Sequence, residues 1–367
     1  MKLQDKVALI MAGGTGGHVF PALAVAQALR DQGVEVHWLG TRTGIESRIV
    51  PEAGFDISYI KIKGLRGNGI VRWVVAPFKI IFATVQALKI CLNIKPSFVL
   101  GMGGFVTWPG GVAAKILARP LLIHEQNAIP GLTNRLLGKI SNRVLQAFPN
   151  TFKANKRLYH TGNPVRKSIL DLEKPEQRYT SRQTPIRILI IGGSLGAQAL
   201  NEVVPSAVAM INPEYQVEIW HQAGKQKLES TKARYKSENT DDRCAALKIV
   251  EFIDDIEQAY QWADLVICRA GAMTVTEISN VGIASLLVPY PYAVDDHQTA
   301  NARYLSDANA ALLIQQKDLS PSRLASELQN LIQQGRQHLL EMANRALQLG
   351  RPDATEVVVQ HCMEVSL

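Results

Sequence analysis

The stretch VALIMAGGTGGHVFPALAVAQALRDQG, residues 7–33, decides how this chain folds. It opens with an apolar, β-branched run at Val7–Met11, passes through a glycine-rich turn (AGGTGGH) and continues as a helical pattern over about 20–31. Gly33 then ends the helix before the next strand-like run, Glu35–Leu39. A strand, a glycine turn and a helix in this order predict a parallel sheet with helices on both faces.

The same unit recurs along the chain. Further strands are predicted at Phe98–Leu100, Leu121–His124 and Val144–Ala147, and a second series begins with RILIIGGSLGA at 187–197. Between the two series, DLEKPEQRYTSRQTPI (171–186) is polar and nearly free of large aliphatic side chains. That composition predicts an exposed linker or surface loop.

The two strand–glycine-turn–helix openings predict two doubly wound α/β domains of the Rossmann type. We expect these domains at 1–164 and 165–344, with the last helix, about 345–367, packing back on the first domain. Ligands of such sheets bind at the carboxyl ends of the strands. We therefore expect the substrates in a cleft shared by the two parallel sheets.

The glycine turns are candidate phosphate sites. Glycine lets the backbone approach an anion closely, and the following helix offers free N–H groups and a positive dipole end. Similar turns occur in GMGGFVTWPGG (101–111), GGSLGA (192–197) and RAGAMTVTE (269–277). A tight turn that binds nothing is the alternative. In the last turn, Thr274 and Glu277 have capping-box spacing, so Glu277 either caps the helix or accepts two ribose hydroxyls.

Two common nucleotide motifs are not matched. A G-x-G-x-x-G motif that starts at Gly14 would need glycine at Val19, and Glu35 stands at the beginning of the second strand instead of its end. This disfavours a nicotinamide-dependent oxidoreductase. G-x-x-x-x-G-K-[ST] is absent too, which argues against an ordinary P-loop nucleotidase.

Composition limits the partners. Hydrophobic residues form 47% and charged residues 20% of the chain, as in ordinary globular proteins, and the net charge of +8 favours an acidic partner. The positive charges are dispersed, which argues against a nucleic-acid-binding module. The four cysteines lack C-x-x-C spacing and the eight histidines lack H-x-x-x-H pairing, so we expect no disulfide framework and no structural metal. The amino-terminal residues lack a secretory signal pattern, which favours a cytoplasmic protein.

Eight segments together resemble one family. They are GGTGGHVFPALA, GMGGFVTWPGG, HEQNAIPG, TGNPVR, GGSLGA, EFIDD, RAGAMTVTE and DDHQTANA, which lie in this order between residues 13 and 302. In these segments the chain resembles the MurG family, bacterial transferases that convert lipid I to lipid II in peptidoglycan synthesis. The resemblance implies the GT-B fold, in which two Rossmann-like domains with parallel sheets face a central cleft, and UDP-N-acetylglucosamine as donor.

The resemblance also implies which residues bind the substrates. The donor-binding residues that it implies are Thr15, Gly16, Gly17, Asn127, Arg166, Ser194, Ile253, Ala272, Met273, Thr274, Val275, Thr276, Glu277 and Gln298. Within that set, the backbone of Ile253 would contact the uracil, and Asn127 and Gln298 would contact the donor sugar. Gly14, Gly103 and Gly104 would belong to the loops that take the acceptor and its diphosphate. Residues at four positions depart from those common in the family, namely Phe105, Trp108, Ala270 and His297.

The implied reaction inverts the anomeric carbon and needs a base for the attacking hydroxyl of lipid I. His18 is the first candidate, because histidine titrates near neutrality and this one ends the glycine loop. It could instead hydrogen-bond a phosphate or cap the helix. Glu125 is the rival base, and it could also orient the acceptor together with Asn127. No Asp-x-Asp occurs in the sequence, so we expect no tightly bound metal or other cofactor.

A membrane contact is expected between residues 62 and 92. Arg66, Arg72, Lys79 and Lys89 interrupt its apolar residues, so no transmembrane span is predicted. A stripe at helical spacing is assigned mostly to the core; it consists of Phe78, Ile81, Phe82, Val85, Leu88 and Leu92. The remaining residues form a predicted patch for anionic lipid, made of Ile70, Arg72, Trp73, Val74, Val75 and Lys79.

The resemblance and the predicted lipid patch imply a peripheral protein at the cytoplasmic face of the bacterial inner membrane. Its expected partners are UDP-N-acetylglucosamine, lipid I, an anionic membrane surface and other cell-wall synthesis proteins, and no nucleic acid. The alternative function is a non-hydrolysing UDP-sugar epimerase of the same fold, which would act on the donor without an acceptor.

Overall fold

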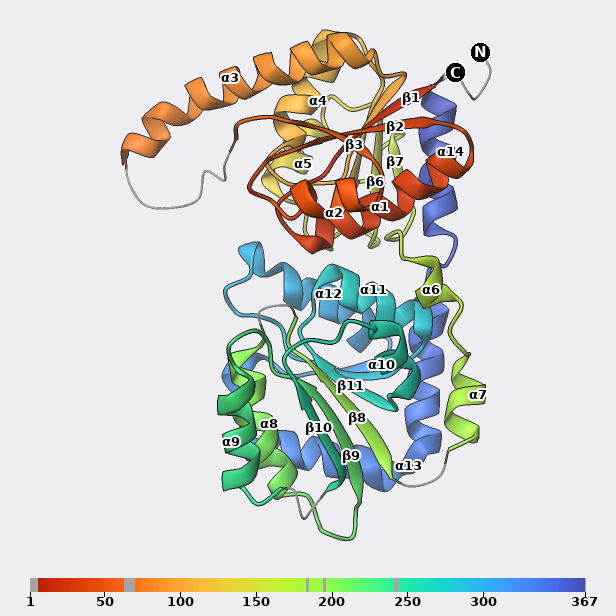
Figure 1. The fold of residues 1–367 in the computed structure, drawn as a ribbon. Helices are drawn as coiled ribbons and strands as arrows, with labels where there is room; N and C mark the ends of the chain where they lie inside the picture. Colours follow the sequence, from red (N-terminus) through yellow and green to blue (C-terminus); the bar gives the residue numbers. More distant parts are fainter. Residues whose placement is uncertain (1–5, 63–69, 183–184, 194–195, 241–243, 367) are drawn as a thin grey trace. The chain divides into compact units, whose positions relative to one another are not determined.

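The computed structural model describes residues 6–62, 70–182, 185–193, 196–240 and 244–366, without the side chains of 70–74 and 294. The chain divides into two compact units (Figure 1). The N-terminal unit comprises Met1–Arg166 and Arg351–Leu367, and the C-terminal unit comprises Lys167–Gly350. The sequence analysis placed the boundaries at 164 and 344, a few residues earlier in each case.

The N-terminal unit is built on a parallel sheet of order β3-β2-β1-β4-β5-β6-β7. Its strands are β1 (Val7–Met11), β2 (Glu35–Gly40), β3 (Asp56–Tyr59), β4 (Phe98–Gly101), β5 (Leu121–Glu125), β6 (Arg143–Gln146) and β7 (Leu158–His160). Its helices are α1 (Gly16–Asp31), α2 (Glu46–Glu52), α3 (Ile70–Ile94), α4 (Thr107–Ile116), α5 (Leu132–Leu137) and α14 (Ala354–Val365). The predicted strand Val7–Met11 is therefore confirmed.

Alternation along β1 creates two cores in this unit. Ala8 and Ile10 face a cluster that includes residues of α1, α2 and α14. Leu9 and Met11 face the opposite cluster, which includes residues of α3, α4 and α5. Successive side chains of a strand point to opposite faces, so an unbroken apolar run such as VALIM fits a sheet that is covered on both sides.

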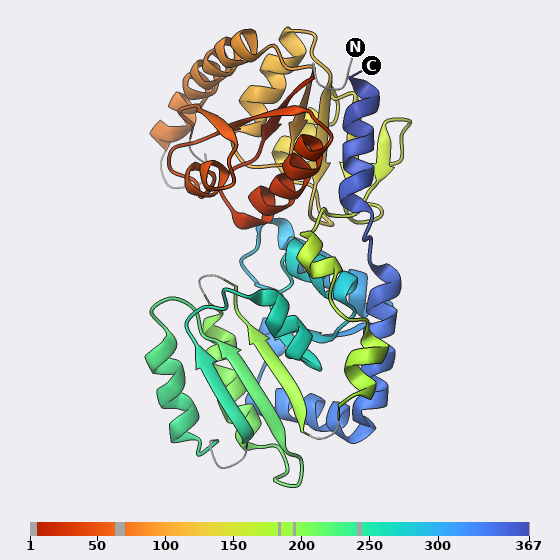
Figure 2. The ribbon, with the colours of Figure 1, turned by 45° about the vertical axis from the view of Figure 1, so that its right-hand side comes forward.

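The C-terminal unit repeats this plan around a parallel sheet of order β10-β9-β8-β11-β12-β13. Figure 2 shows β8, β9 and β10 side by side. Its strands are β8 (Ile186–Ile191), β9 (Val217–Gln222), β10 (Cys244–Val250), β11 (Leu265–Cys268), β12 (Ala284–Leu287) and β13 (Ala311–Leu313). Its α-helices are α6 (Lys167–Leu170), α7 (Pro175–Thr180), α8 (Gln198–Ala209), α9 (Leu228–Ser237), α10 (Ile256–Trp262), α11 (Ala272–Val281), α12 (His297–Ser306) and α13 (Pro321–Leu349).

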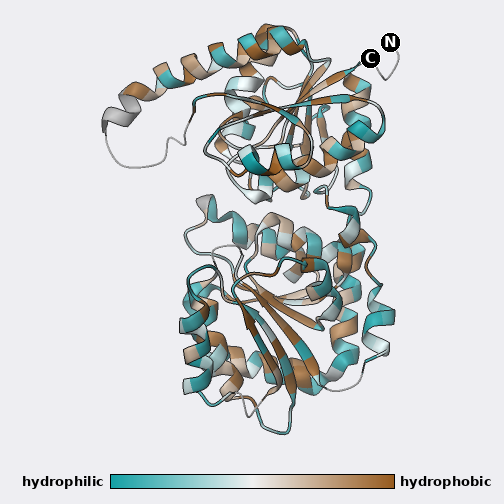
Figure 3. Ribbon diagram, viewed as in Figure 1, coloured by the Kyte–Doolittle hydropathy of each residue, from teal (hydrophilic) through white to brown (hydrophobic). Residues whose placement is uncertain are grey.

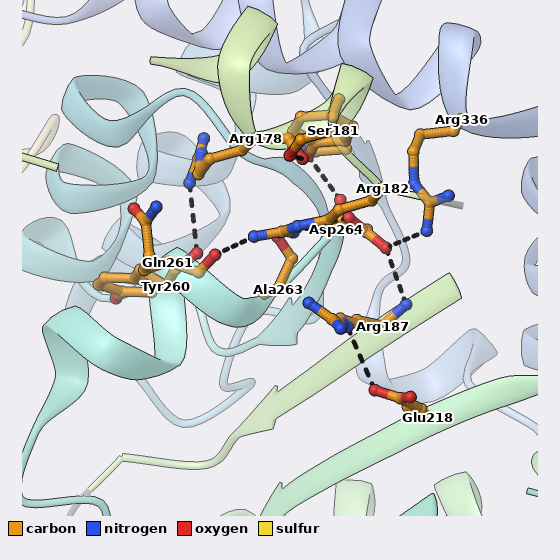
Figure 4. Close-up of polar contacts among 12 residues, drawn as sticks. Arg178, Ser181, Arg182, Arg187, Glu218, Tyr260, Gln261, Ala263, Asp264 and Arg336 are labelled. Atoms are coloured by element: carbon orange, nitrogen blue, oxygen red, sulfur yellow. Dashed lines mark hydrogen bonds and ion pairs between the residues drawn. The ribbon is translucent and has the colours of Figure 1, made fainter. Parts of the chain in front are cut away.

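The exposed linker or surface loop predicted at 171–186 is exposed at many of its described positions, but it is not an irregular loop throughout. These residues contain α7, and within it Arg178 is 0% and Tyr179 is 2% exposed. The guanidinium of Arg178 donates to the Tyr260 carbonyl (Figure 4). It also donates to the carbonyls of Val281 and Gly282. Arg178 can be buried because these carbonyls accept its N–H groups, and composition could not reveal those partners.

Asp264 is the centre of a second buried cluster in Figure 4. Its carboxylate, 0% exposed, lies 2.8 Å from Arg182 and 2.8 Å from Arg336, and it accepts the Arg187 N–H at 3.0 Å. These contacts join the segment after α7, strand β8 and helix α13 at the start of β11. A buried carboxylate is tolerated there because donors surround it.

The chain returns to the N-terminal unit at Arg351. Helix α14 packs on α1, with Val358, Val359 and Cys362 in the same core cluster as Ala8 and Ile10. Glu364 also pairs with Arg143 at 2.5 Å. The C-terminal helix thus completes one face of the sheet that the first strand began.

Candidate active site

Each sheet reverses its strand order at one point. In the N-terminal unit the chain moves outward from β1 to β3 and then returns to pair β4 with β1. In the C-terminal unit the corresponding pair is β8 and β11. Ligands of doubly wound sheets bind at such switch points, beyond the carboxyl ends of the strands. The four glycine turns of the sequence follow these four strands, so each pair of turns lies at a predicted ligand site.

The first two glycine turns are in direct contact. A Cβ atom at Gly104 would lie 2.3 Å from the carbonyl oxygen of Gly13, and the Met102 N–H donates to the Met11 carbonyl at 2.8 Å. Gly14, Gly103 and Gly104 have φ values of +91°, +103° and +89°, a region that other residues rarely adopt. Glycine is therefore required here both by the backbone conformation and by the contact between the turns.

A buried carboxylate that the sequence analysis missed holds the first turn. Glu46, the first residue of α2, is 0% exposed, and its Oε2 accepts the Gly14 N–H at 3.0 Å. Its Oε1 accepts from the N–H and the hydroxyl of Thr41 at 2.9 and 2.8 Å. A cavity of about 160 Å³ lies beside it, and residues of both turns, including Gly14 and Phe105, line this cavity. Local sequence shows only an acidic residue in a first helical turn, so nothing marked Glu46 as special.

His18 is the third residue of α1, and it is half-buried against the turn after β4. A Cβ atom at Gly103 would lie 2.4 Å from its Nδ1, so the imidazole packs directly on that glycine. Nδ1 lies 3.1 Å from Oε1 of Gln126, the residue after Glu125. The structure thus brings His18, Gly103 and the HEQN turn together at one switch point.

The carboxylate of Glu125 is engaged within its own turn. It is 3% exposed, and it accepts hydrogen bonds from the backbone of Asn127 (3.1 Å) and Gly131 (3.1 Å). It also accepts from the side-chain amides of Asn127 (3.3 Å) and Asn134 (2.9 Å). These four hydrogen bonds tie the carboxylate to the 126–131 loop.

In the C-terminal unit, helix α11 starts at the switch point, directly after β11. The helix begins at Ala272 after the N-cap Gly271, which has no side-chain cap. The capping box predicted for Thr274 and Glu277 is therefore wrong, because both residues lie inside the helix. Glu277 instead accepts a hydrogen bond from the Tyr260 hydroxyl at 2.9 Å, through its Oε2. Met273, Val275 and Thr276 lie in the same opening turns, and Thr276 donates to the Ala272 carbonyl.

The other implied donor residues are distributed over both units. Ile253 is 7% exposed in the turn before α10, and Gln298 accepts the Tyr290 N–H at 2.9 Å. Arg166, which was expected in the second domain, belongs to the N-terminal unit, where its guanidinium lies 5.9 Å from the centre of the Phe20 ring. Ser194 lies outside the described residues. Thr15, Gly16 and Gly17 form the first turn of α1, where Thr15 is the N-cap.

The assignment of the α3 stripe to the core is wrong. Phe78, Ile81, Phe82, Val85 and Leu92 are between 44% and 69% exposed, and of the stripe only Leu88 packs against the core. The buried face of α3 consists of Ala76, Ala83, Ala87 and Cys91. Small residues let α3 pack closely on α4, and the large side chains are left exposed. The hydropathy colouring shows hydrophobic residues recurring along α3 (Figure 3). Periodicity defined the apolar face but could not show that the alanine face is the inner one.

The predicted lipid patch is described only in part. Val75 is 37% exposed and Lys79 is exposed, whereas the side chains of Ile70, Arg72, Trp73 and Val74 lie outside the described residues. By length and composition alone, Val75–Ile94 could cross a membrane, with a mean hydropathy of 1.6 and 22% of that window buried. The charges in this segment therefore did not exclude a span by that criterion, as the sequence analysis had assumed.

Among the described residues, no group of three or more histidine, cysteine, aspartate or glutamate side chains could hold a metal ion. The positively polarised groups at the two switch points are backbone N–H groups at the beginnings of α1 and α11.

Known proteins match this chain over nearly its whole length. Residues 8–146 match the glycosyltransferase family 28 N-terminal domain, and 187–358 match the C-terminal domain of that family. A protein of Nitrosococcus oceani is 51% identical over 360 residues, 98% of each chain. Its name is UDP-N-acetylglucosamine–N-acetylmuramyl-(pentapeptide) pyrophosphoryl-undecaprenol N-acetylglucosamine transferase. The chain belongs to the MurG family of glycosyltransferases.

A solved MurG structure has the same fold. The crystal structure of Acinetobacter baumannii MurG superposes with a TM-score of 0.86 at 44% identity, and the match covers 98% of this chain and 99% of that chain. The predicted fold class of two Rossmann-like domains with parallel sheets is confirmed. A Listeria monocytogenes protein provisionally named UDP-N-acetylglucosamine 2-epimerase also superposes, with a TM-score of 0.66 at 12% identity, over 96% of this chain and 95% of that chain. At that identity only the fold is shared.

Proposed function

We propose that this MurG-family enzyme transfers N-acetylglucosamine from UDP-N-acetylglucosamine to the muramyl 4-hydroxyl of lipid I, which yields lipid II. The observation that carries the proposal is the assembly of His18 with two contacting glycine turns at a switch point, in a chain 51% identical to a transferase of that name. Glycosyl transfer needs a proton acceptor and donors for a diphosphate, and these residues supply both.

In the proposed step, the oxygen of the muramyl 4-hydroxyl attacks the anomeric carbon of the donor. The bond from that carbon to the diphosphate breaks, UDP leaves, and the hydroxyl proton passes to His18. His18 suits this role because it is half-buried and packs on the turn after β4. Glu125 is less suited because four donors already occupy its carboxylate.

For the leaving group, we assign the donor diphosphate to the start of α11 and the ribose to Glu277. The helix N-terminus supplies backbone N–H groups and a positive dipole end. Tyr260 fixes one oxygen of the Glu277 carboxylate, which leaves the group oriented for recognition of a diol. We propose that no resident metal or other cofactor is needed, and activity that persists in a chelator would support this.

The test of the transfer reaction is UDP release from UDP-N-acetylglucosamine, with and without a lipid I analogue. We expect release that depends on the acceptor and a disaccharide product. Donor turnover without acceptor would instead favour the epimerase. Replacing His18 by alanine should lower kcat by roughly 10²–10⁴-fold with little change in donor affinity. A kcat within about tenfold of wild type would contradict the base assignment and return Glu125 as the candidate.

We propose further that the exposed face of α3 lies on the cytoplasmic membrane surface that carries the lipid acceptor. This face comprises Phe78, Ile81, Phe82, Val85 and Leu92, with Lys79 and Lys89 exposed on the same helix. Large apolar side chains combined with lysines suit an interface with anionic lipid. The membrane contact is thus moved from the predicted 70–79 patch along the helix toward residue 92.

A further inference from the structure

We propose that Gln126 is a positioning residue that holds His18 in the tautomer with a proton on Nδ1 and a lone pair on Nε2. The inference rests on the proposed role of His18 as the base and adds which nitrogen acts. It comes from a chain of hydrogen bonds that runs from a backbone carbonyl through His124 and Gln126 to His18, all within the N-terminal unit.

The first link is set by the Gly162 carbonyl. Nε2 of His124 lies 2.9 Å from this oxygen, which can only accept, so Nε2 must carry a proton. His124 is 0% exposed, and burial lowers the pKa of His124 to about 4, so the ring is neutral at physiological pH. A neutral ring with a proton on Nε2 has an acceptor at Nδ1.

The second link orients the amide of Gln126. Its nitrogen lies 3.2 Å from that Nδ1 acceptor and 2.8 Å from the Met102 carbonyl oxygen. Both partners accept, so the amide must present its NH₂ group to them. In the opposite orientation, the amide oxygen of Gln126 would face two acceptors, His124 Nδ1 and the Met102 carbonyl oxygen. Because Gln126 is 1% exposed, water cannot compensate for such a mismatch at low cost.

The third link decides the tautomer of His18. Because the amide nitrogen of Gln126 donates to these two acceptors, its Oε1 is the atom that faces Nδ1 of His18, at 3.1 Å. An amide oxygen only accepts, so Nδ1 of His18 must donate. In the neutral imidazole, Nε2 then carries the lone pair that a general base requires. The ring packs on Gly103, where a Cβ atom would lie 2.4 Å from Nδ1, so no side chain separates it from that turn.

This arrangement does the work of the carboxylate that orients the base histidine in a catalytic triad. A neutral amide fixes the tautomer and accepts the Nδ1–H bond, but it adds no negative charge beside the imidazole. The nearby carboxylate of Glu125 is engaged with its own loop instead. Gln126 therefore orients His18 without supplying a negative charge that would stabilise the protonated imidazole.

The experiment compares Gln126→Leu and Gln126→Glu with the control Gln146→Leu. Gln146 is another buried glutamine of the N-terminal unit, and it accepts the Phe152 N–H away from His18. We expect Gln126→Leu to lower kcat by about 10–10²-fold with KM for the donor nearly unchanged, because the fraction of correctly oriented base falls. Gln126→Glu retains an acceptor for Nδ1–H but places a carboxylate oxygen opposite His124 Nδ1 and the Met102 carbonyl, so it should recover only part of kcat. Its rate should require a higher pH because a carboxylate stabilises the imidazolium.

A direct measurement is the ¹⁵N spectrum of histidine-labelled wild-type protein, with the His18 signals assigned by their loss in His18→Ala. We expect the neutral form to be protonated at Nδ1, and Gln126→Leu to shift it toward Nε2–H. Protonation at Nε2 in the wild type would overturn the inference, as would an unchanged kcat in Gln126→Leu. Should Gln126→Leu not fold, the wild-type spectrum and the pH profile of Gln126→Glu still decide. If His18→Ala retains activity while the spectrum is as expected, the base assignment fails and the tautomer stands.

Discussion

The imidazole of His18 packs on the backbone of Gly103, so closely that a Cβ atom at this glycine would lie 2.4 Å from Nδ1. The two residues come from turns after neighbouring strands, β1 and β4, and their contact fixes the ring beside Gln126. The position of the proposed base is thus set by a residue that has no side chain.

Replacing Gly103 by alanine should displace His18. The added methyl group meets the ring, and the φ of +103° disfavours any residue with a Cβ atom. We expect kcat to fall by about 10²-fold or more, as for loss of a general base. Gly131→Ala is the matched control in steady-state kinetics, because a Cβ atom there meets nothing within 4 Å. Equal losses in the two variants would contradict the role of Gly103.

Removing the hydroxyl of Tyr260 should affect donor binding. Tyr260 is 1% exposed and donates to Glu277, the residue assigned to the ribose, at 2.9 Å. We expect Tyr260→Phe to raise KM for the donor by about tenfold, the equivalent of one hydrogen bond, with kcat nearly unchanged. Tyr304→Phe, which loses a hydroxyl bound to the Leu349 carbonyl, should leave both constants close to wild type. A fall in kcat alone after Tyr260→Phe would argue against the assignment of Glu277.

A charge on the exposed face of α3 should weaken membrane binding. Phe82 and Met210 are almost equally exposed, at 54% and 53%, but Met210 lies at the end of α8 in the C-terminal unit. In sedimentation with anionic vesicles, Phe82→Glu should reduce binding by about tenfold or more, since a phenyl group loses its apolar burial. Met210→Glu adds the same charge and should change binding less than about twofold. Similar losses in both variants would show a nonspecific charge effect.

Acid should destabilise the C-terminal unit through His221. This side chain is 0% exposed between Tyr235 and Asn201, and burial lowers the pKa of His221 to about 3. An unfolded histidine titrates near 6.5, so between these values the unfolded state binds a proton that the folded state does not. The free energy of unfolding must therefore fall as the pH drops through this range. Between pH 7.5 and 5.0 the contribution of His221 is about 2 kcal/mol.

Urea unfolding at these two pH values measures this contribution. His221→Gln is less stable at neutral pH but should lose about 2 kcal/mol less than wild type on acidification. His338→Gln removes a histidine of α13 and should keep the wild-type slope. An unchanged slope in His221→Gln would mean that other groups cause the acid sensitivity.

The local patterns of the sequence predicted five strands of the first sheet, the first helix and the recurrence of the same unit in the second half. An apolar run, a glycine turn and a helix of 3.6-residue period are local features, so the first strand was predicted with its observed ends, Val7–Met11. The predictions failed where one sequence pattern is compatible with either burial or exposure of the same residues. The apolar stripe of α3 was placed inside although its alanine face is buried, and Arg178 was placed in an exposed segment although carbonyl partners bury it.

The candidate site divides in the same way. The glycine turns, His18 and the HEQN segment could be found from the sequence, because their residue types and spacing indicate which chemistry they can perform. Glu46, Tyr260 and Gln126 could not, because their roles depend on partners 32, 17 and 108 positions away along the chain.

By itself, the sequence determined that two doubly wound domains carry glycine turns after particular strands, and family membership followed from those turns. Only the tertiary structure decided which nitrogen of His18 can accept a proton. The physical reason is that a tautomer is selected by the groups opposite the ring, and those groups come from β5, the loop after β4 and the Gly162 turn. Residue spacing records none of these contacts, whereas the packing of parallel strands places them side by side.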